Sequence, residues 1–271
     1  MLDPQPLIFR FRLHAWRRNL GNFALIKHRH CVGHLLSMHQ SGTHWLKFML
    51  ANALSHQYGT PPPAYNHAND IIGGPKDLPL YPQLPRIIAS HTIAHPLLRF
   101  ASVHGLCKLP RYVVLVRDIR TALASNYTKW RSAYGVSFSE YLAGDTRGRK
   151  FNHDLWWSLR FLNSWGEVRQ KVPKRVTVIR YETLENDAAG ELERIAHDLD
   201  LDLSHAAIEH GVAVSTRRLM QEKDDPRRPP GAVRSATAAP HAFFDEAGKA
   251  FLTKVLTACL RHDFGYDYTR W

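Results

Sequence analysis

Four short apolar runs along the chain alternate with longer stretches in which apolar residues recur at helical intervals. The runs are short and continuous, which is typical of strands buried on both faces of a parallel sheet. They cover residues 32–38, 86–90, 112–116 and 176–181. The helical pattern covers residues 43–58, 119–131, 151–172, 182–199 and 243–261, with a helical turn expected within residues 95–103. This alternation predicts an α/β fold, a parallel β-sheet of about four to five strands with helices on both faces.

Two segments between these elements lack a sustained period. Residues 59–85 are rich in Pro, Gly, Asn and Asp, and residues 221–240 are polar, basic and rich in proline. Both are expected to be surface loops, and the first is long enough to cover a site. With 271 residues, the chain has room for one α/β domain, which we assign to residues 31–271, after a basic N-terminal arm of residues 1–30.

The overall charge is strongly positive, with 36 Lys and Arg against 24 Asp and Glu and a formal net charge of +12. Anionic ligands and polyanions are natural partners of such a chain. A basic nucleic-acid-binding protein is the alternative from another class, but the basic residues are scattered, with no helix-turn-helix pattern or zinc spacing. We therefore expect no nucleic-acid partner. Cys31, Cys107 and Cys259 fit neither a zinc site nor a disulfide framework, which favours a reducing, cytoplasmic location.

The arm of residues 1–30 mixes six Lys and Arg residues with Leu, Ile, Phe and Trp. It contains no uninterrupted apolar stretch of the ~18 residues that a membrane span needs. One interpretation is a basic amphipathic contact with a membrane surface or a partner, which would place the protein at the periphery of a membrane. The other is a partly ordered leader that packs Ile8, Phe9, Phe11 and Leu13 on the domain.

Residues 39–46, His-Gln-Ser-Gly-Thr-His-Trp-Leu, connect the first apolar run to the helical stretch that follows it. A tight loop from a strand into a helix brings backbone N–H groups and the positive end of the helix dipole to one point, which suits a phosphate. A nucleotide triphosphatase loop would need a lysine directly after its second glycine, and Gly42 is followed by Thr43 and His44. We therefore expect the 5′-phosphate of another kind of nucleotide.

Three further segments, residues 86–91, 112–127 and 176–184, place polar residues at the end of a predicted strand. In the second of them, Arg117 ends the strand and Ser125 lies in the second turn of the helix that follows. Two side chains placed in this way can hold one phosphate from two sides. The alternative for Arg117 is an ordinary surface ion pair with Asp118 or Glu182.

Together these segments resemble the cytosolic-type sulfotransferases, which have a P-loop-like fold, over roughly residues 31–268. Residues 41–46 are similar to the 5′-phosphosulfate loop of that family, usually Pro-Lys-Ser-Gly-Thr-Thr-Trp-Leu, and residues 112–127 look like its 3′-phosphate segment. Residues 86–91 are similar to its strand ending in Lys-Thr-His, and residues 176–184 to its strand ending in Tyr-Glu-Asp-Leu. The resemblance implies transfer of a sulfuryl group from 3′-phosphoadenosine 5′-phosphosulfate (PAPS) to an acceptor hydroxyl, without a metal.

The resemblance also implies roles for residues of this chain. His91 is the expected general base, a task that suits a group titrating near neutral pH. Trp45 is expected to lie against the adenine, Tyr181 against the adenine or its phosphate, and Arg117 and Ser125 to bind the 3′-phosphate. The full set expected to bind the cofactor is Gln40, Ser41, Gly42, Thr43, His44, Trp45, Arg117, Ser125, Tyr181, Arg227, Arg228 and Gly231, of which the last three come from a weaker match to the family's closing loop.

One departure from the family pattern concerns charge. Gln40 stands where the family has the lysine of its phosphate loop. Because a neutral amide supplies no charge, other groups must stabilise the charge that develops in the transition state. The nearby candidates are His39, His44 and Lys47; we favour His44, together with Gln40, as the catalytic partner of His91. A catalytically repurposed nucleotide-binding fold is the alternative.

Aromatic and basic residues after the predicted 3′-phosphate helix are candidates for an acceptor site. We expect Trp130, Tyr134 and Trp156 to contact the acceptor, although many aromatic residues of this region suit a core equally well. The positive charge favours an acidic sugar, a glycan or a lipid-linked sugar as the acceptor. A small phenol or a lipid alcohol stays open.

Overall fold

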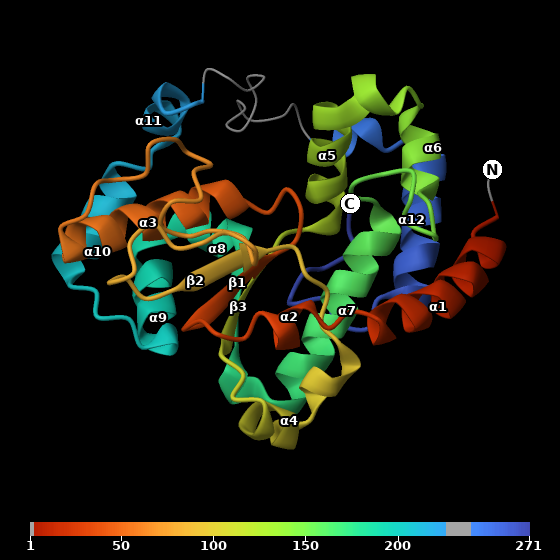
Figure 1. Cartoon of the computed structure of the whole chain (residues 1–271). Helices are drawn as coiled ribbons and strands as arrows, with labels where there is room; N and C mark the ends of the chain where they lie inside the picture. Colours follow the sequence, from red (N-terminus) through yellow and green to blue (C-terminus); the bar gives the residue numbers. More distant parts are fainter. Residues whose placement is uncertain (1–2, 226–239) are drawn as a thin grey trace.

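The computed structural model describes residues 3–225 and 240–271, and within them four strands form one parallel sheet (Figure 1). The strands are β1 (Gly33–Ser37), β2 (Ile87–Ser90), β3 (Arg111–Val116) and β4 (Val176–Arg180). Their order is β2-β1-β3-β4, and the register places Leu36 opposite Ser90, Ser37 opposite Leu115 and Val116 opposite Arg180. The carboxyl ends of the strands therefore meet at one edge of the sheet. The predicted α/β fold is confirmed.

Helices cover both faces of the sheet because successive side chains of a strand point to opposite sides. In β3, Tyr112, Val114 and Val116 belong to one apolar core, whereas Val113 and Leu115 belong to the other. The first core includes residues of α1 (Gln5–Leu20), α5 (Ile119–Tyr134), α7 (Leu155–Lys171) and α12 (Glu246–Cys259). The second includes residues of α3 (Thr43–Tyr58), α9 (Ala188–Leu199) and α10 (His205–Ala213). Figure 1 shows these two groups of helices on the two sides of the sheet.

The remaining elements are short and lie in the connections. They are α2 (Ala24–Lys27), α4 (Ala101–Leu106), α6 (Phe138–Ala143), α8 (Tyr181–Asn186), α11 (Arg217–Glu222) and the 3-10 helices η1 (Pro96–Arg99), η2 (Pro173–Arg175) and η3 (Pro240–Phe243). Residues 59–85 contain no helix or strand, only an isolated bridge from Gly73 to Ile88, as expected for a loop.

Two helices differ from the sequence prediction because an aspartate caps a helix start. The helix expected over residues 182–199 is divided into α8 and α9 at Asp187, whose backbone is not helical and whose side chain accepts the N–H of Gly190. The helix expected from residue 151 begins at Leu155, because Asp154 accepts the N–H of Trp157. In both cases the carboxylate satisfies an N–H that lacks a partner in the helix and complements the helix dipole.

Most of the basic N-terminal arm is the helix α1, which packs on α7 and α12. Ile8 and Phe11 are buried as the packing interpretation expected, whereas Phe9 and Leu13 are exposed. Arg12 donates to the carbonyl of Ala258 in α12 (3.1 Å), which helps to hold α1 on the domain. No helix within residues 3–225 and 240–271 is both long and apolar enough to cross a membrane.

Candidate active site

The loop of residues 38–42 turns the chain from β1 into α3 at the carboxyl edge of the sheet. Gly42 has a φ of +89°, a left-handed conformation that glycine adopts without strain. Ser41 is buried, and its hydroxyl donates to the Met38 carbonyl (2.5 Å). No side chain caps the first N–H groups of this 16-residue helix. The positive end of the helix dipole is therefore available to an anion.

Tyr181, the first residue of α8, closes one side of this loop. A Cβ atom at position 42 would lie 2.8 Å from the Tyr181 ring, so this close approach also requires glycine. The guanidinium of Arg117 lies over the Tyr181 ring, 4.1 Å from its centroid, and the Trp45 ring meets it edge-on at 6.3 Å. The indole N–H of Trp45 donates to the Ser215 carbonyl (3.0 Å). We call Gly42, Trp45, Arg117 and Tyr181, with the start of α3, the donor cluster.

Arg117 follows β3 and carries a charge that no carboxylate of the described residues neutralises. Asp118 pairs instead with Arg120 (2.6 Å), and Glu182 accepts a tyrosine hydroxyl (2.5 Å). Arg117 donates to the Gln40 carbonyl (2.8 Å), and its buried Nε atom has no hydrogen-bond partner in the described part of the chain. A half-buried cation with an unused buried donor fits an anionic ligand. The alternative considered from the sequence, an ion pair of Arg117 with Asp118 or Glu182, is thus not formed.

His91 directly follows β2 and is oriented by the neighbouring strand β1. Its Nδ1 atom lies 2.8 Å from the Ser37 carbonyl oxygen, which can only accept a hydrogen bond, so Nδ1 carries the proton and Nε2 has a free lone pair. The Ser37 hydroxyl lies 3.2 Å from the same Nδ1 and accepts the hydroxyl of Thr43 (2.8 Å). Burial lowers the pKa of His91. This arrangement presents a neutral proton acceptor that is linked through Ser37 to the first residue of α3.

Comparisons with known proteins identify the family of the chain. A family model described as the sulfotransferase domain matches residues 34–227. This chain belongs to the sulfotransferase family. Among solved structures, mouse sulfotransferase SULT7A1 complexed with PAP is similar to it with a TM-score of 0.61 at 15% identity, covering 93% of this chain and 91% of that one. Retinol dehydratase in a complex with retinol and PAP has a TM-score of 0.56 at 15% identity, with 93% and 88% covered. A search of curated protein sequences gives no match.

A group of aromatic rings surrounds the candidate base of this sulfotransferase. The His39 ring stacks on the His91 ring at a centroid distance of 3.8 Å, and it meets Trp157 edge-on at 4.6 Å. The His153 ring lies 5.3 Å from the His39 ring, measured between centroids. Burial, together with the charges of His91, His153 and Lys129, lowers the pKa of His39 to about 2. Sequence reasoning named His39 only as a charge-carrying candidate and Trp157 only among the aromatic residues that could line an acceptor site. It missed His153, which no motif or spacing marks.

Gln40 and the other two candidates for charge near the loop, His44 and Lys47, have different surroundings. Gln40 has a φ of +62°, and its side chain points to Asn126, with 3.4 Å between Nε2 and Oδ1. His44 lies in the first turn of α3 and is exposed, and the surrounding protein and the charge of Lys47 lower its pKa. Lys47 is buried and donates to the side chain of Asn69. The Lys47 ammonium thus points to the loop of residues 59–85.

The predicted acceptor residues occupy three different environments. Trp156 is buried in the core, and its indole N–H donates to the Ala143 carbonyl (2.7 Å). Tyr134 is half-buried and stacks on Tyr141 at 5.7 Å. Trp130 is half-buried on α5, with the Lys129 ammonium 5.6 Å from its ring centroid. The structure therefore leaves Trp130 and part of Tyr134 accessible, and it uses Trp156 for packing.

Asn126 joins several of these groups into a second polar cluster. Its amide donates to the hydroxyls of Tyr134 (3.2 Å) and Tyr141 (3.0 Å) and to the His153 carbonyl (3.1 Å). Its oxygen accepts from Gln40. We call Asn126, Tyr134, Tyr141 and His153 the asparagine network. Both the nitrogen and the oxygen of the Asn126 side-chain amide thus form hydrogen bonds within the protein.

Several predicted positions remain to be placed. Ser125 lies half-buried in the second turn of α5, the helix that begins two residues after Arg117. Arg227, Arg228 and Gly231, expected in the closing loop, lie outside the described residues. Within residues 3–225 and 240–271, no group of three or more His, Cys, Asp or Glu side chains is arranged to hold a metal ion.

Proposed function

We propose that this protein transfers a sulfuryl group from PAPS to a hydroxyl group of an acceptor, with His91 as the general base. The fixed tautomer of His91 carries this proposal. Because Nδ1–H is held by the Ser37 carbonyl at 2.8 Å, Nε2 can take the acceptor's proton. The buried position lowers the pKa of His91, which keeps the ring neutral near pH 7.

The start of α3 fits the phosphosulfate end of the donor. Its uncapped N–H groups and dipole favour an anion, and Ser41, Gly42 and Thr43 bring the backbone into the required turn. When bound, PAPS supplies a sulfuryl group attached to a good leaving group. Nε2 of His91 accepts the hydroxyl proton as the acceptor oxygen bonds to sulfur and the bond from sulfur to the 5′-phosphate oxygen breaks. Product PAP keeps the 5′-phosphate.

The other residues of the donor cluster suit the 3′-phosphate and the adenine of the donor. The charge of Arg117 has no carboxylate partner among the described residues, and its buried Nε is an unused donor, so it would hold the 3′-phosphate together with Ser125. Trp45 and Tyr181 offer aromatic surface on which a purine can stack. These groups favour a nucleotide with a 3′-phosphate over ATP.

The missing lysine leaves the handling of charge to neighbouring groups. We propose that Gln40 donates a neutral hydrogen bond and that His44, in the first turn of α3, supplies positive charge when the anionic donor raises its pKa. His39 lies against His91 and is the other histidine at this point. If the Gln40→Ala and His44→Ala variants both keep full turnover, these two residues do not have this role.

For the acceptor we propose a hydroxyl of a sugar, a glycan or a lipid-linked sugar, on the ground of the basic surface and of the partly accessible Trp130 and Tyr134. Retinol dehydratase, a structural neighbour, has been solved with retinol and with androsterone, and both are small molecules. We further propose a cytoplasmic location, which the free thiols of the three cysteines support.

Thermal unfolding with different nucleotides tests the donor site. PAP at about 100 times its dissociation constant is expected to stabilise the protein by roughly 2.7 kcal/mol. ATP and ADP at the same concentration should shift the unfolding temperature much less, because they lack the 3′-phosphate. Equal stabilisation by ATP and PAP would contradict the proposal.

A further inference from the structure

The helix α1 has two apolar faces, and only one of them packs on the protein. Ile8 and Phe11 are buried against α7 and α12. On the opposite side, Phe9, Leu13, Trp16 and Leu20 are 71%, 56%, 66% and 39% exposed. Their spacing of four, three and four residues places them within an arc of about 60° on a helix with 3.6 residues per turn. We call these four side chains the α1 stripe.

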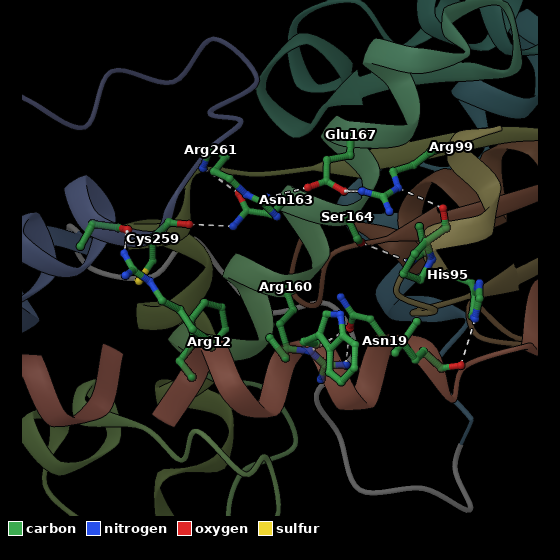
Figure 2. A pocket seen from close by; sticks show the side chains of 17 residues that line it. Arg12, Asn19, His95, Arg99, Arg160, Asn163, Ser164, Glu167, Cys259 and Arg261 are labelled. Carbon is green, nitrogen blue, oxygen red and sulfur yellow. Dashed lines mark hydrogen bonds and ion pairs between the residues drawn. The ribbon is translucent and has the colours of Figure 1, made fainter. Parts of the chain in front are cut away.

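The inner face of α1 is held firmly, so the stripe is a surface with a fixed orientation. Arg160 of α7 donates twice to the Asn19 side chain (3.2 and 2.8 Å), and the His95 side chain contacts the Leu20 carbonyl (3.0 Å). With the bond from Arg12 to α12, these contacts fix both halves of the helix (Figure 2). An exposed apolar stripe on an anchored helix marks an interaction surface.

Basic side chains flank the stripe. Arg10 and Arg17 are exposed on one side of it, and Arg12 lies on the other. Within residues 3–30 there are six Lys and Arg residues and one acidic residue, Asp3. This combination of an apolar stripe containing tryptophan with flanking arginines suits a helix that lies in the interface of an anionic bilayer.

A cavity beside the stripe adds to the positive charge. Its volume is about 480 Å³, and α1, α7, α12 and η1 surround it, with Trp16 and Leu20 of the stripe on its wall. It is lined by Arg12, Arg99, Arg160 and Arg261 but by a single acidic residue, Glu167, which pairs with Arg99 (3.1 Å) and Arg261 (2.7 Å) (Figure 2). Arg160 is buried and is held by the neutral Asn19 side chain. The lining therefore has a clear excess of positive charge.

We propose that α1 docks this protein on an anionic membrane surface, with the α1 stripe in the apolar layer and the flanking arginines at the level of the lipid phosphates. A second copy of the chain fits this face less well, because a symmetric contact would bring the basic residues of two α1 helices together. The proposal does not depend on the proposed sulfuryl transfer.

Vesicle sedimentation with the full chain tests this docking. We expect binding to vesicles of phosphatidylcholine containing phosphatidylglycerol, weak binding to pure phosphatidylcholine, and loss of affinity as salt is raised. The Phe9→Ser/Leu13→Ser double variant should bind at least about tenfold more weakly, because it removes two large apolar side chains from the stripe. The Arg10→Gln/Arg17→Gln double variant should bind more weakly and with less dependence on salt.

The matched control removes two leucines elsewhere on the surface that are more exposed than Phe9 and Leu13. Leu78 is 86% and Leu106 is 84% exposed, and the Leu78→Ser/Leu106→Ser variant should bind vesicles as the wild type does. Because the substituted stripe residues are exposed, unfolding temperatures of all variants should stay close to that of the wild type. The proposal is overturned if wild-type protein does not bind anionic vesicles or if both double variants of α1 bind as the control does. It is also overturned if sedimentation velocity shows a wild-type dimer that the stripe variant abolishes.

Discussion

Two polar clusters meet at Gln40, and they differ in how far the protein uses their hydrogen-bonding groups. In the donor cluster, the start of α3 has no cap and Arg117 keeps a buried Nε without a partner among the described residues. In the asparagine network, the Asn126 amide donates to two tyrosine hydroxyls and a carbonyl, although the Nδ1 atom of His153 has no partner among the described residues. Gln40 contributes its carbonyl to Arg117 and its side chain to Asn126. Unused buried donors indicate a ligand, whereas satisfied ones indicate a structural role.

The largest expected effect concerns the base beside the donor cluster. His91→Gln keeps a side chain that can reach the Ser37 carbonyl but removes the proton acceptor, so kcat should fall by about 10²- to 10⁴-fold. The affinity for PAP, measured by calorimetry, should change little. The rate is measured with radiolabelled PAPS and an acceptor found by screening sugars, glycans and lipid-linked sugars. Undiminished turnover would remove His91 from its proposed role.

Arg117 tests the donor cluster itself. Because its charge is not used by a carboxylate of the described residues, Arg117→Ala should weaken PAP binding by about 10- to 100-fold. The free energy of unfolding should fall by only about 1 kcal/mol, through the lost hydrogen bond to the Gln40 carbonyl. Arg120, which pairs with Asp118, is the matched control: Arg120→Ala should destabilise the fold by about 3 kcal/mol and leave PAP affinity unchanged. Calorimetry and urea unfolding distinguish the two. The reverse result would mean that the unpaired arginine has a structural role.

A variant of Asn126 tests the asparagine network, and here we expect a loss of stability with little change in PAP affinity. Asn126→Ala removes the amide that donates to the hydroxyls of Tyr134 and Tyr141, whereas the His153 carbonyl keeps the Tyr141 hydroxyl as a donor (3.1 Å). The loss should lower the free energy of unfolding by about 2 to 3 kcal/mol. PAP affinity should stay within a few fold of the wild-type value. A loss of affinity as large as that of Arg117→Ala would show that the network belongs to the ligand site.

The smallest expected effect is the loss of stability at acidic pH. It comes from His153 of the asparagine network. Burial, with the charge of His91, lowers the pKa of His153 from its ordinary value of 6.5 to about 3. The unfolded chain therefore binds this proton first as the pH falls, so the stability that His153 contributes above pH 6.5 is lost below it. Between pH 7.5 and 5 the loss is about 2 kcal/mol. His153→Phe should reduce the pH dependence measured by urea unfolding, and an unchanged dependence would contradict the assignment.

The strands and the ends of the sheet could be predicted well from sequence. Continuous apolar runs mark buried parallel strands, and parallel strands necessarily bring their carboxyl ends to one edge, so His91, Arg117 and Tyr181 were expected near the loop of residues 39–46. The two helix boundaries at Asp154 and Asp187 were missed because a single capping side chain decides them locally. Helices α6 and α10 were also not expected from the pattern.

The sequence by itself determined the α/β fold, the strand ends and the residue types of the donor loop, because these depend on local patterns and on the topology that follows from them. Only the tertiary structure decided which groups are used. It stacks His39 on His91, gives Asp118 to Arg120 and leaves Arg117 without a described carboxylate, and it buries Trp156 while exposing Phe9 and Leu13. Such contacts join residues that are far apart along the chain. Neither the period of apolar residues nor the spacing of motif residues can therefore predict them. They decide whether a polar group serves a ligand or the fold.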